Sequence, residues 1–259
     1  MLRLERRKTS EFLDKKHERA LKDRVRSAQK IATTPPGAQR TKKIRYQWGN
    51  FRQGKTSKGT FDLLWRELCA MSFEKCAFCE VPAPSTVEHK EEVSRHPERT
   101  FDWDNLLPAC GDCNRKRENS GIDARPLDPS ESDPLDVLGW DEYGKFTPDP
   151  KHRPAVMAHV AMYGLDRFNE ERKREISVFR ELLCTLVTDT PPRQGTLDCI
   201  RVALTPTSAW RGPIREYLLR PPTTDDAWLI DEALQRVPDI RAWVKPWLRP
   251  RRVDGSRWT

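Results

Sequence analysis

The sequence predicts an α+β protein, in which a small zinc-stapled ββα unit is embedded in a mostly helical framework. Two Cys-x-x-Cys pairs with short strand-like segments beside them predict the unit, and apolar residues at helical spacing on both sides predict the framework. The chain has 259 residues, of which 36% are hydrophobic and 33% charged. It is long enough to bury a core, and it has no apolar run of membrane-spanning length, so we expect no membrane association.

The four cysteines Cys76, Cys79, Cys110 and Cys113 have the spacing of a structural zinc site. A Cys-x-x-Cys on a tight turn directs two thiolates to one point, and two such turns complete a tetrahedral shell of four sulfurs. The alternatives are a pair of disulfides or a spacing that arises by chance. The N-terminus is charged from Arg3 onward and lacks an apolar run, so we expect a reducing, cytoplasmic location, in which zinc is favoured over disulfides.

Two strands and a helix are predicted around these cysteines. Residues 86–89 (T-V-E-H) follow the chain-breaking Pro82 and Pro84 and have the composition of a short strand. Leu106 and Leu107 predict a second strand, and the charged residues from Cys113 onward predict a helix. The order strand, loop, strand, helix is the ββα unit, held at its base by zinc.

This segment resembles the HNH family of ββα-metal nucleases, through C-A-F-C-E, V-E-H, W-D-N-L-L-P-A-C and G-D-C-N. The resemblance implies that His89, at the end of the first strand, is the general base that activates water. It implies that Glu88, where most members have Asp, and Asn114, on the helix, hold the catalytic metal ion. It also implies that Asn105 fixes the loop that aims the histidine. All four are therefore candidate catalytic residues.

The chemistry of phosphodiester hydrolysis requires such residues. An imidazole titrates near neutral pH and can accept the proton of the attacking water. Oxygen ligands from Glu and Asn suit a hard cation, so we expect Mg²⁺ or Mn²⁺ at this site in addition to structural zinc. The helix also carries the run Arg115, Lys116 and Arg117, which is suited to backbone phosphates.

The N-terminal part of the chain is strongly basic. Residues 1–60 hold 18 Lys and Arg against 5 Asp and Glu, a charge balance that suits nucleic-acid binding. Residues 10–31 have the spacing of an amphipathic helix, and the segment 39–58 contains no acidic residue. This segment also contains Tyr46, Trp48 and Phe51. Two interpretations stay open: an arm for substrate or partner, or an extended segment that places its aromatic residues in the core.

We divide the chain into four parts: a basic N-terminal helix and arm (1–60), the nuclease core with the zinc site (61–125), a hairpin and helical support region (126–220), and a helical C-terminal appendage with a basic tail (221–259). The expected elements outside the ββα unit are helices at 61–72, 154–163, 167–187, 197–204, 210–219, 227–237 and 240–248, and a hairpin at 137–147.

A narrower resemblance covers residues 40–220. The motifs D-V-L-G-W-D-E-Y-G-K-F, M-Y-G-L-D-R-F-N-E-E-R and W-R-G-P-I-R-E-Y-L are similar to those of the HNH subunit of Septu-type and retron-associated bacterial defence systems. That resemblance implies an anti-phage nuclease that acts with an ABC/SMC-like ATPase partner, with DNA favoured over RNA as the substrate. The alternative is a non-catalytic zinc module that binds nucleic acid or protein. Such a module would not need Glu88, His89 and Asn114 together, so their coexistence favours the enzyme.

Overall fold

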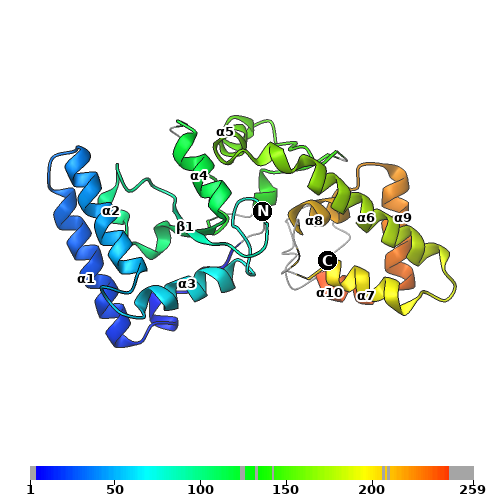
Figure 1. The fold of residues 1–259 in the computed structure, drawn as a ribbon. Coiled ribbons are helices and arrows are strands. Elements are labelled where there is room, and N and C mark those ends of the chain that lie inside the picture. Colours follow the sequence, from blue (N-terminus) through cyan, green and yellow to red (C-terminus); the bar gives the residue numbers. More distant parts are fainter. Residues whose placement is uncertain are drawn as a thin grey trace.

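The computed structural model describes residues 4–122, 126–131, 134–141, 143–205, 208 and 211–244. It is mostly helical and contains one small two-stranded sheet (Figure 1). The α-helices are α1 (Lys15–Ala32), α2 (Ala38–Arg52), α3 (Thr60–Met71), α4 (Gly111–Asn119), α5 (Arg153–Tyr163), α6 (Asn169–Thr188), α7 (Gln194–Ala203), α8 (Arg211–Leu219), α9 (Thr224–Arg236) and α10 (Asp239–Val244). The strands are β1 (Thr86–His89) and β2 (Leu106–Ala109), and short 3-10 helices lie at η1 (Thr9–Glu11), η2 (Pro97–Arg99), η3 (Trp103–Asn105), η4 (Pro134–Asp136) and η5 (Leu165–Phe168).

The two strands pair in antiparallel register and carry the predicted catalytic segment. Thr86 lies opposite Ala109, and His89 lies opposite Leu106. Both strands lie where the sequence predicts them. Helix α4 follows β2 after a single residue, Cys110, whose side chain caps the helix, and α4 packs against β1. The start of β1 and the start of α4 are therefore neighbours in space, since Thr86 contacts Asn114, and the later α4 residue Arg117 lies against Glu88 near the end of β1.

The basic segment 39–58 is mainly helical, which corrects the expectation of an extended segment. Its residues form most of α2, which packs beside α1 as a helical hairpin at the left of Figure 1. The chain turns between the two helices at Gly37, whose φ is +154°. The aromatic residues of α2 divide: Phe51 is fully buried, Trp48 is half-buried and Tyr46 is exposed. Of the two interpretations left open for the aromatic residues, packing in the core holds for Phe51. The segment that places it there is a helix and not an extended segment.

The helices predicted after the strands are present, with ends that shift by a few residues. Gly164, in the left-handed conformation with φ of +57°, ends α5 and leads through η5 into α6. The hairpin predicted at 137–147 is present as a short one: the Asp141 and Thr147 N–H groups donate to the Lys145 and Gly139 carbonyls at 3.0 and 2.8 Å, around an antiparallel bridge between Trp140 and Phe146. Residues 245–248 of the last predicted helix lie outside the described residues.

The buried apolar residues form two clusters. The first extends from Leu4 to Leu165 and surrounds the sheet, and the second extends from Ile176 to Ile240 and joins α6 to α10. Glu80, beside the zinc-type cysteines, accepts a hydrogen bond of 2.9 Å from the Gly212 N–H and so connects the two clusters. Among the helices in the described ranges, none is both long and apolar enough to cross a membrane. The candidate site lies on the first cluster.

Candidate metal centre and catalytic cavity

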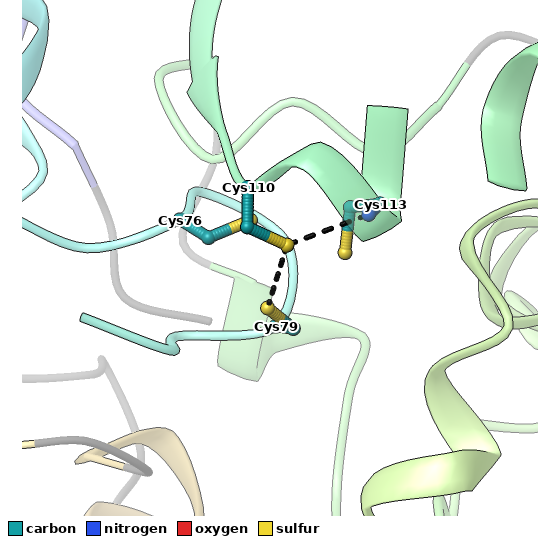
Figure 2. Close-up of side chains that lie close together, drawn as sticks. All are labelled: Cys76, Cys79, Cys110 and Cys113. Atoms are coloured by element: carbon teal, nitrogen blue, oxygen red, sulfur yellow. Dashed lines mark hydrogen bonds between the residues drawn. The ribbon is translucent and has the colours of Figure 1, made fainter. Parts of the chain in front are cut away.

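The four predicted cysteines converge on one point (Figure 2). Their sulfur atoms all lie within 4.8 Å of one another, although the two pairs are far apart in sequence. Cys76 and Cys79 come from the loop before β1, whereas Cys110 and Cys113 come from the end of β2 and the start of α4. The structure thus brings all four predicted ligands together.

The sulfur spacing fits a tetrahedral zinc ion. A Zn–S bond of about 2.3 Å in a tetrahedron places neighbouring sulfurs roughly 3.8 Å apart, and the Cys79 and Cys110 sulfurs lie 3.7 Å apart. The Cys110 sulfur raises the pKa of the Cys79 and Cys113 thiols above their ordinary range, because negative charge accumulates among close sulfurs. A bound dication would neutralise the negative charge of the four thiolates and so favour their deprotonated form. The four sulfurs are therefore suited to zinc.

Backbone hydrogen bonds in the two turns fix the positions of these sulfurs. The Cys110 sulfur accepts a hydrogen bond of 3.4 Å from the Cys113 N–H, so the first turn of α4 fixes two ligands. The Cys76 N–H donates to the Val81 carbonyl at 2.9 Å, which closes the first turn. Glu80 ends that turn in the left-handed region, with φ of +62°. The four-cysteine cluster therefore connects β2 and α4 to the loop before β1.

A cavity of about 620 Å³ opens beside the sheet, on the face reached by the ends of β1 and α4. Glu88 and His89 line it from β1, and Asn114 lines it from α4. The other lining residues are Arg45, Trp48, Arg52, Val87, Lys90, Glu91, Glu92, Val93, Ser94, Arg95, His96, Arg117, Glu118, Ser120, Gly121 and Ile122. Three of the four candidate catalytic residues thus share one cavity, and the fourth, Asn105, is fully buried and does not line it.

His89 is held by two contacts. Its Nε2 lies 3.0 Å from the Thr100 carbonyl, so Nε2 carries the proton and Nδ1 keeps its lone pair. The Trp48 ring meets the imidazole edge-on at a centroid distance of 4.7 Å. Burial lowers the pKa of His89 to about 4, and the nearby Arg52 lowers it further against the opposing Thr100 carbonyl. The imidazole is therefore neutral at pH 7, with one nitrogen able to accept a proton.

Glu88 is a buried carboxyl group that faces a cation. Burial raises its pKa to about 8, although the Arg117 guanidinium, with Nε 3.5 Å from the Glu88 Oε1, opposes the shift. The sequence predicts only that Arg117 binds phosphate. In the structure its guanidinium group lies beside the Glu88 carboxyl group instead. A divalent cation at the carboxylate would favour its ionised form, since metal ligands bind deprotonated.

Asn105 joins the two ends of the loop that follows β1. Its side-chain oxygen accepts from the Glu91 N–H at 2.8 Å, and its amide nitrogen donates to the Glu91 and Arg99 carbonyls at 3.2 and 3.0 Å. The Lys90 N–H donates to the Asn105 carbonyl at 3.0 Å. The residue is fully buried. Its bonds thus fix the loop that carries Thr100, the hydrogen-bond partner of His89.

The remaining predicted residues lie on α4. The Asn114 amide nitrogen donates to the Thr86 hydroxyl at 2.8 Å, which leaves the amide oxygen as the group suited to a cation. Arg115 is exposed and forms an ion pair with Asp112, one turn earlier. Lys116 is also exposed. These two cations lie on the outer surface of α4 and do not line the cavity.

Three cavity residues lie on α2, of which sequence reasoning named only Trp48, as part of a possible substrate arm, and missed Arg45 and Arg52. Arg45, Trp48 and Arg52 have the i, i+3, i+7 spacing of one helical face, and that face lines the cavity. The spacing is visible in the sequence, but it indicates a face only after the segment is recognised as a helix.

Comparison with known families supports the chemistry that this geometry suggests. Residues 74–120 match the family described as HNH endonuclease, and this range contains the four cysteines, both strands and α4. No curated protein matches the chain. Residues 74–120 are therefore similar to an HNH endonuclease domain, which supports a nuclease that acts on nucleic acid with a divalent metal.

Proposed function

We propose that the protein is a metal-dependent endonuclease that hydrolyses phosphodiester bonds of DNA in the cavity beside β1. The observation that carries the proposal is the convergence of Glu88, His89 and Asn114 on one cavity, within the residues that match the HNH endonuclease family. We propose further that strand β1, strand β2 and helix α4 form a ββα-metal unit stapled by zinc. A non-catalytic zinc module would not require these three polar side chains to meet in a cavity.

His89 acts as the general base in this proposal. Its Nε2–H donates to the Thr100 carbonyl, so the Nδ1 lone pair faces the attacking water and takes its proton. Asn105 is a positioning residue, because its bonds hold the loop that carries Thr100. The low pKa of His89 means that it starts the reaction unprotonated at neutral pH.

Glu88 and Asn114 would hold the catalytic ion through their side-chain oxygens. A Mg²⁺ or Mn²⁺ ion bound there supplies positive charge for the phosphoryl and leaving oxygens. Arg117, which pairs with Glu88 at the edge of the cavity, adds a fixed positive charge close to the same position. Arg115 and Lys116 would contact phosphates farther from the scissile bond.

The exchange Glu88→Gln tests this assignment. Glutamine matches the size of the buried, largely protonated carboxyl group, but it removes the negative charge that a cation needs, so we expect intact folding. Metal-dependent plasmid cleavage should fall by at least about 10²-fold at low Mn²⁺, since even outer-shell substitutions at metal sites cost up to that much. The matched control is Glu118→Gln, which removes a carboxylate from the same cavity and should retain activity. Equal activity of the two variants would contradict the role of Glu88.

We propose in addition that the protein is a cytoplasmic effector of bacterial anti-phage defence, which acts with an ABC/SMC-like ATPase. The support is the resemblance of the flanking motifs to Septu-type and retron-associated HNH subunits, together with a sequence that has no nucleotide-binding motif of its own. Tagged protein purified from its native host should carry an ATPase of this class in fixed proportion, identified by mass spectrometry. Purification of the nuclease without such a subunit, from cells in which it protects against phage, would contradict the partnership.

A further inference from the structure

One face of α2 forms a wall of the catalytic cavity. Arg45, Trp48 and Arg52 all line it, and the Trp48 ring lies in edge contact with the His89 imidazole. Both arginines are exposed at the cavity mouth. A polymer bound with one phosphate beside His89 would therefore have this face of α2 within reach.

The distribution of charged side chains around the cavity favours phosphate binding on the α2 face. The loop after β1 contributes the acidic residues Glu91 and Glu92, and α4 contributes Glu118, whereas the charged residues that α2 contributes to the lining are both arginines. The basic groups near those acids are already paired: Glu91 binds Arg99 at 2.5 Å, and Glu92 binds Arg95 at 3.5 Å.

Arg45 and Arg52 differ from the other arginines around the site. Arg117 pairs with Glu88, and Arg115 pairs with Asp112. Within the ranges that the structure describes, no ion pair joins Arg45 or Arg52 to a carboxylate. Their guanidinium groups can therefore bind phosphate without first breaking an internal ion pair.

Gly49 lies on the same side of the helix, between the two arginines. Glycine in a helix interior costs stability relative to alanine, and packing does not require it here, because a Cβ at this position would meet no atom within 4 Å. The position leaves a bare stretch of helix surface between two cationic side chains. Such a gap lets a sugar-phosphate backbone approach closely.

We propose that this face of α2, with Arg45 and Arg52 on either side of Gly49, binds the phosphate backbone of DNA that flanks the scissile bond. The inference rests on the proposed nuclease function. It identifies the face of α2 as a part of the substrate site, in addition to the residues of β1 and α4. Arg45 and Arg52 are substrate-binding residues in this proposal, since they contact the DNA backbone that flanks the bond on which His89 acts.

The test compares the double variant Arg45→Gln/Arg52→Gln with wild type in binding a fluorescein-labelled DNA duplex, without divalent ions, over a range of salt concentrations. Each lost phosphate contact lowers the slope of log affinity against log salt by about 0.9, so the double variant should lose about 2 in slope. Its Kd at physiological salt should rise on the order of 10-fold or more. The control is Lys43→Gln, an exposed cation of the same helix that does not line the cavity and points to the opposite side. Its slope should change much less.

A second variant separates binding from folding. Gly49→Gln keeps every charge and fills the gap, and glutamine has the higher helix propensity. We expect its Tm to be unchanged or raised and its affinity for the duplex to fall. Full affinity of Gly49→Gln together with an unchanged salt slope of the double variant would overturn the proposal.

Cleavage measured on the same samples distinguishes this inference from the proposed function. Wild type that cleaves DNA, with variants that bind and cleave equally well, would overturn the α2 assignment and leave the nuclease intact. Wild type that binds the duplex without cleaving it, with binding lost in the double variant, would support the α2 assignment and count against catalysis. Wild type without affinity for the duplex would overturn both.

Discussion

Cys113→Ala is expected to unfold the HNH domain and to abolish zinc binding. The four cysteines hold together β2, α4 and the loop before β1, and β2 and the two cysteine pairs belong to the first hydrophobic cluster. Structural zinc contributes about 10–16 kcal/mol in small zinc domains at neutral pH, which equals or exceeds the whole stability of a typical domain. Elemental analysis should find about one zinc ion per chain in wild type and none in the variant. Circular dichroism should show loss of the cooperative melting transition.

Cys69→Ala is the matched control for this experiment. Cys69 is buried on α3 and lies outside the four-sulfur cluster, so the substitution leaves only a small cavity. It should retain one zinc ion and lose on the order of 1 kcal/mol. If Cys113→Ala melted within a few degrees of Cys69→Ala, the zinc centre would not be structural.

His89→Ala is expected to reduce DNA cleavage by about 10²- to 10⁴-fold, the usual contribution of a general base. Glu88 and Asn114 are unchanged in this variant, so metal binding should persist. The side chain sits half-buried against Trp48 at the cavity, and its loss should leave the fold intact, as judged by the melting temperature. The rate constant for nicking a supercoiled plasmid in Mg²⁺ gives the readout.

His96→Ala is the control, because it removes an imidazole from another position in the same cavity. His96 lines the same cavity, but it is exposed and lies near Glu91 and Glu98 on the loop. Its loss should change the cleavage rate by less than a few-fold. A His89→Ala variant that cleaves as fast as His96→Ala would show that another group activates the water.

The sequence predicts the candidate site better than the surrounding structure, because the site is formed within one short segment of the chain. The ligands lie within the short segment from Cys76 to Asn114, where turns, strand pairing and a helix start fix their positions. Asn105 is predicted as the loop-fixing residue, and the observed bonds to Glu91 and Arg99 provide such a function. The spacing of the cysteines alone predicts their convergence, because each pair lies on one turn.

Features that depend on distant packing are not predicted. Residues 39–58 are predicted as an arm or an extended segment because charge dominates their composition, whereas contacts with α1 and α3 stabilise the helix α2. The pairing of Arg117 with Glu88 depends on the packing of α4 against β1, which no sequence pattern specifies. The hairpin at 137–147, by contrast, depends on its own turn and is predicted from sequence, and backbone hydrogen bonds pair its arms where Gly139 approaches the Thr147 backbone closely.

The most direct test of the central claim is cleavage of supercoiled plasmid by purified wild-type protein in Mg²⁺, in Mn²⁺ and in EDTA. A phosphodiesterase centre built on Glu88, His89 and Asn114 predicts nicked or linear product with either ion and none in EDTA. Excess Mg²⁺ added after EDTA should restore cleavage, which separates the catalytic ion from the buried zinc. Cleavage that continues undiminished in EDTA, or no cleavage with either ion, would contradict the account.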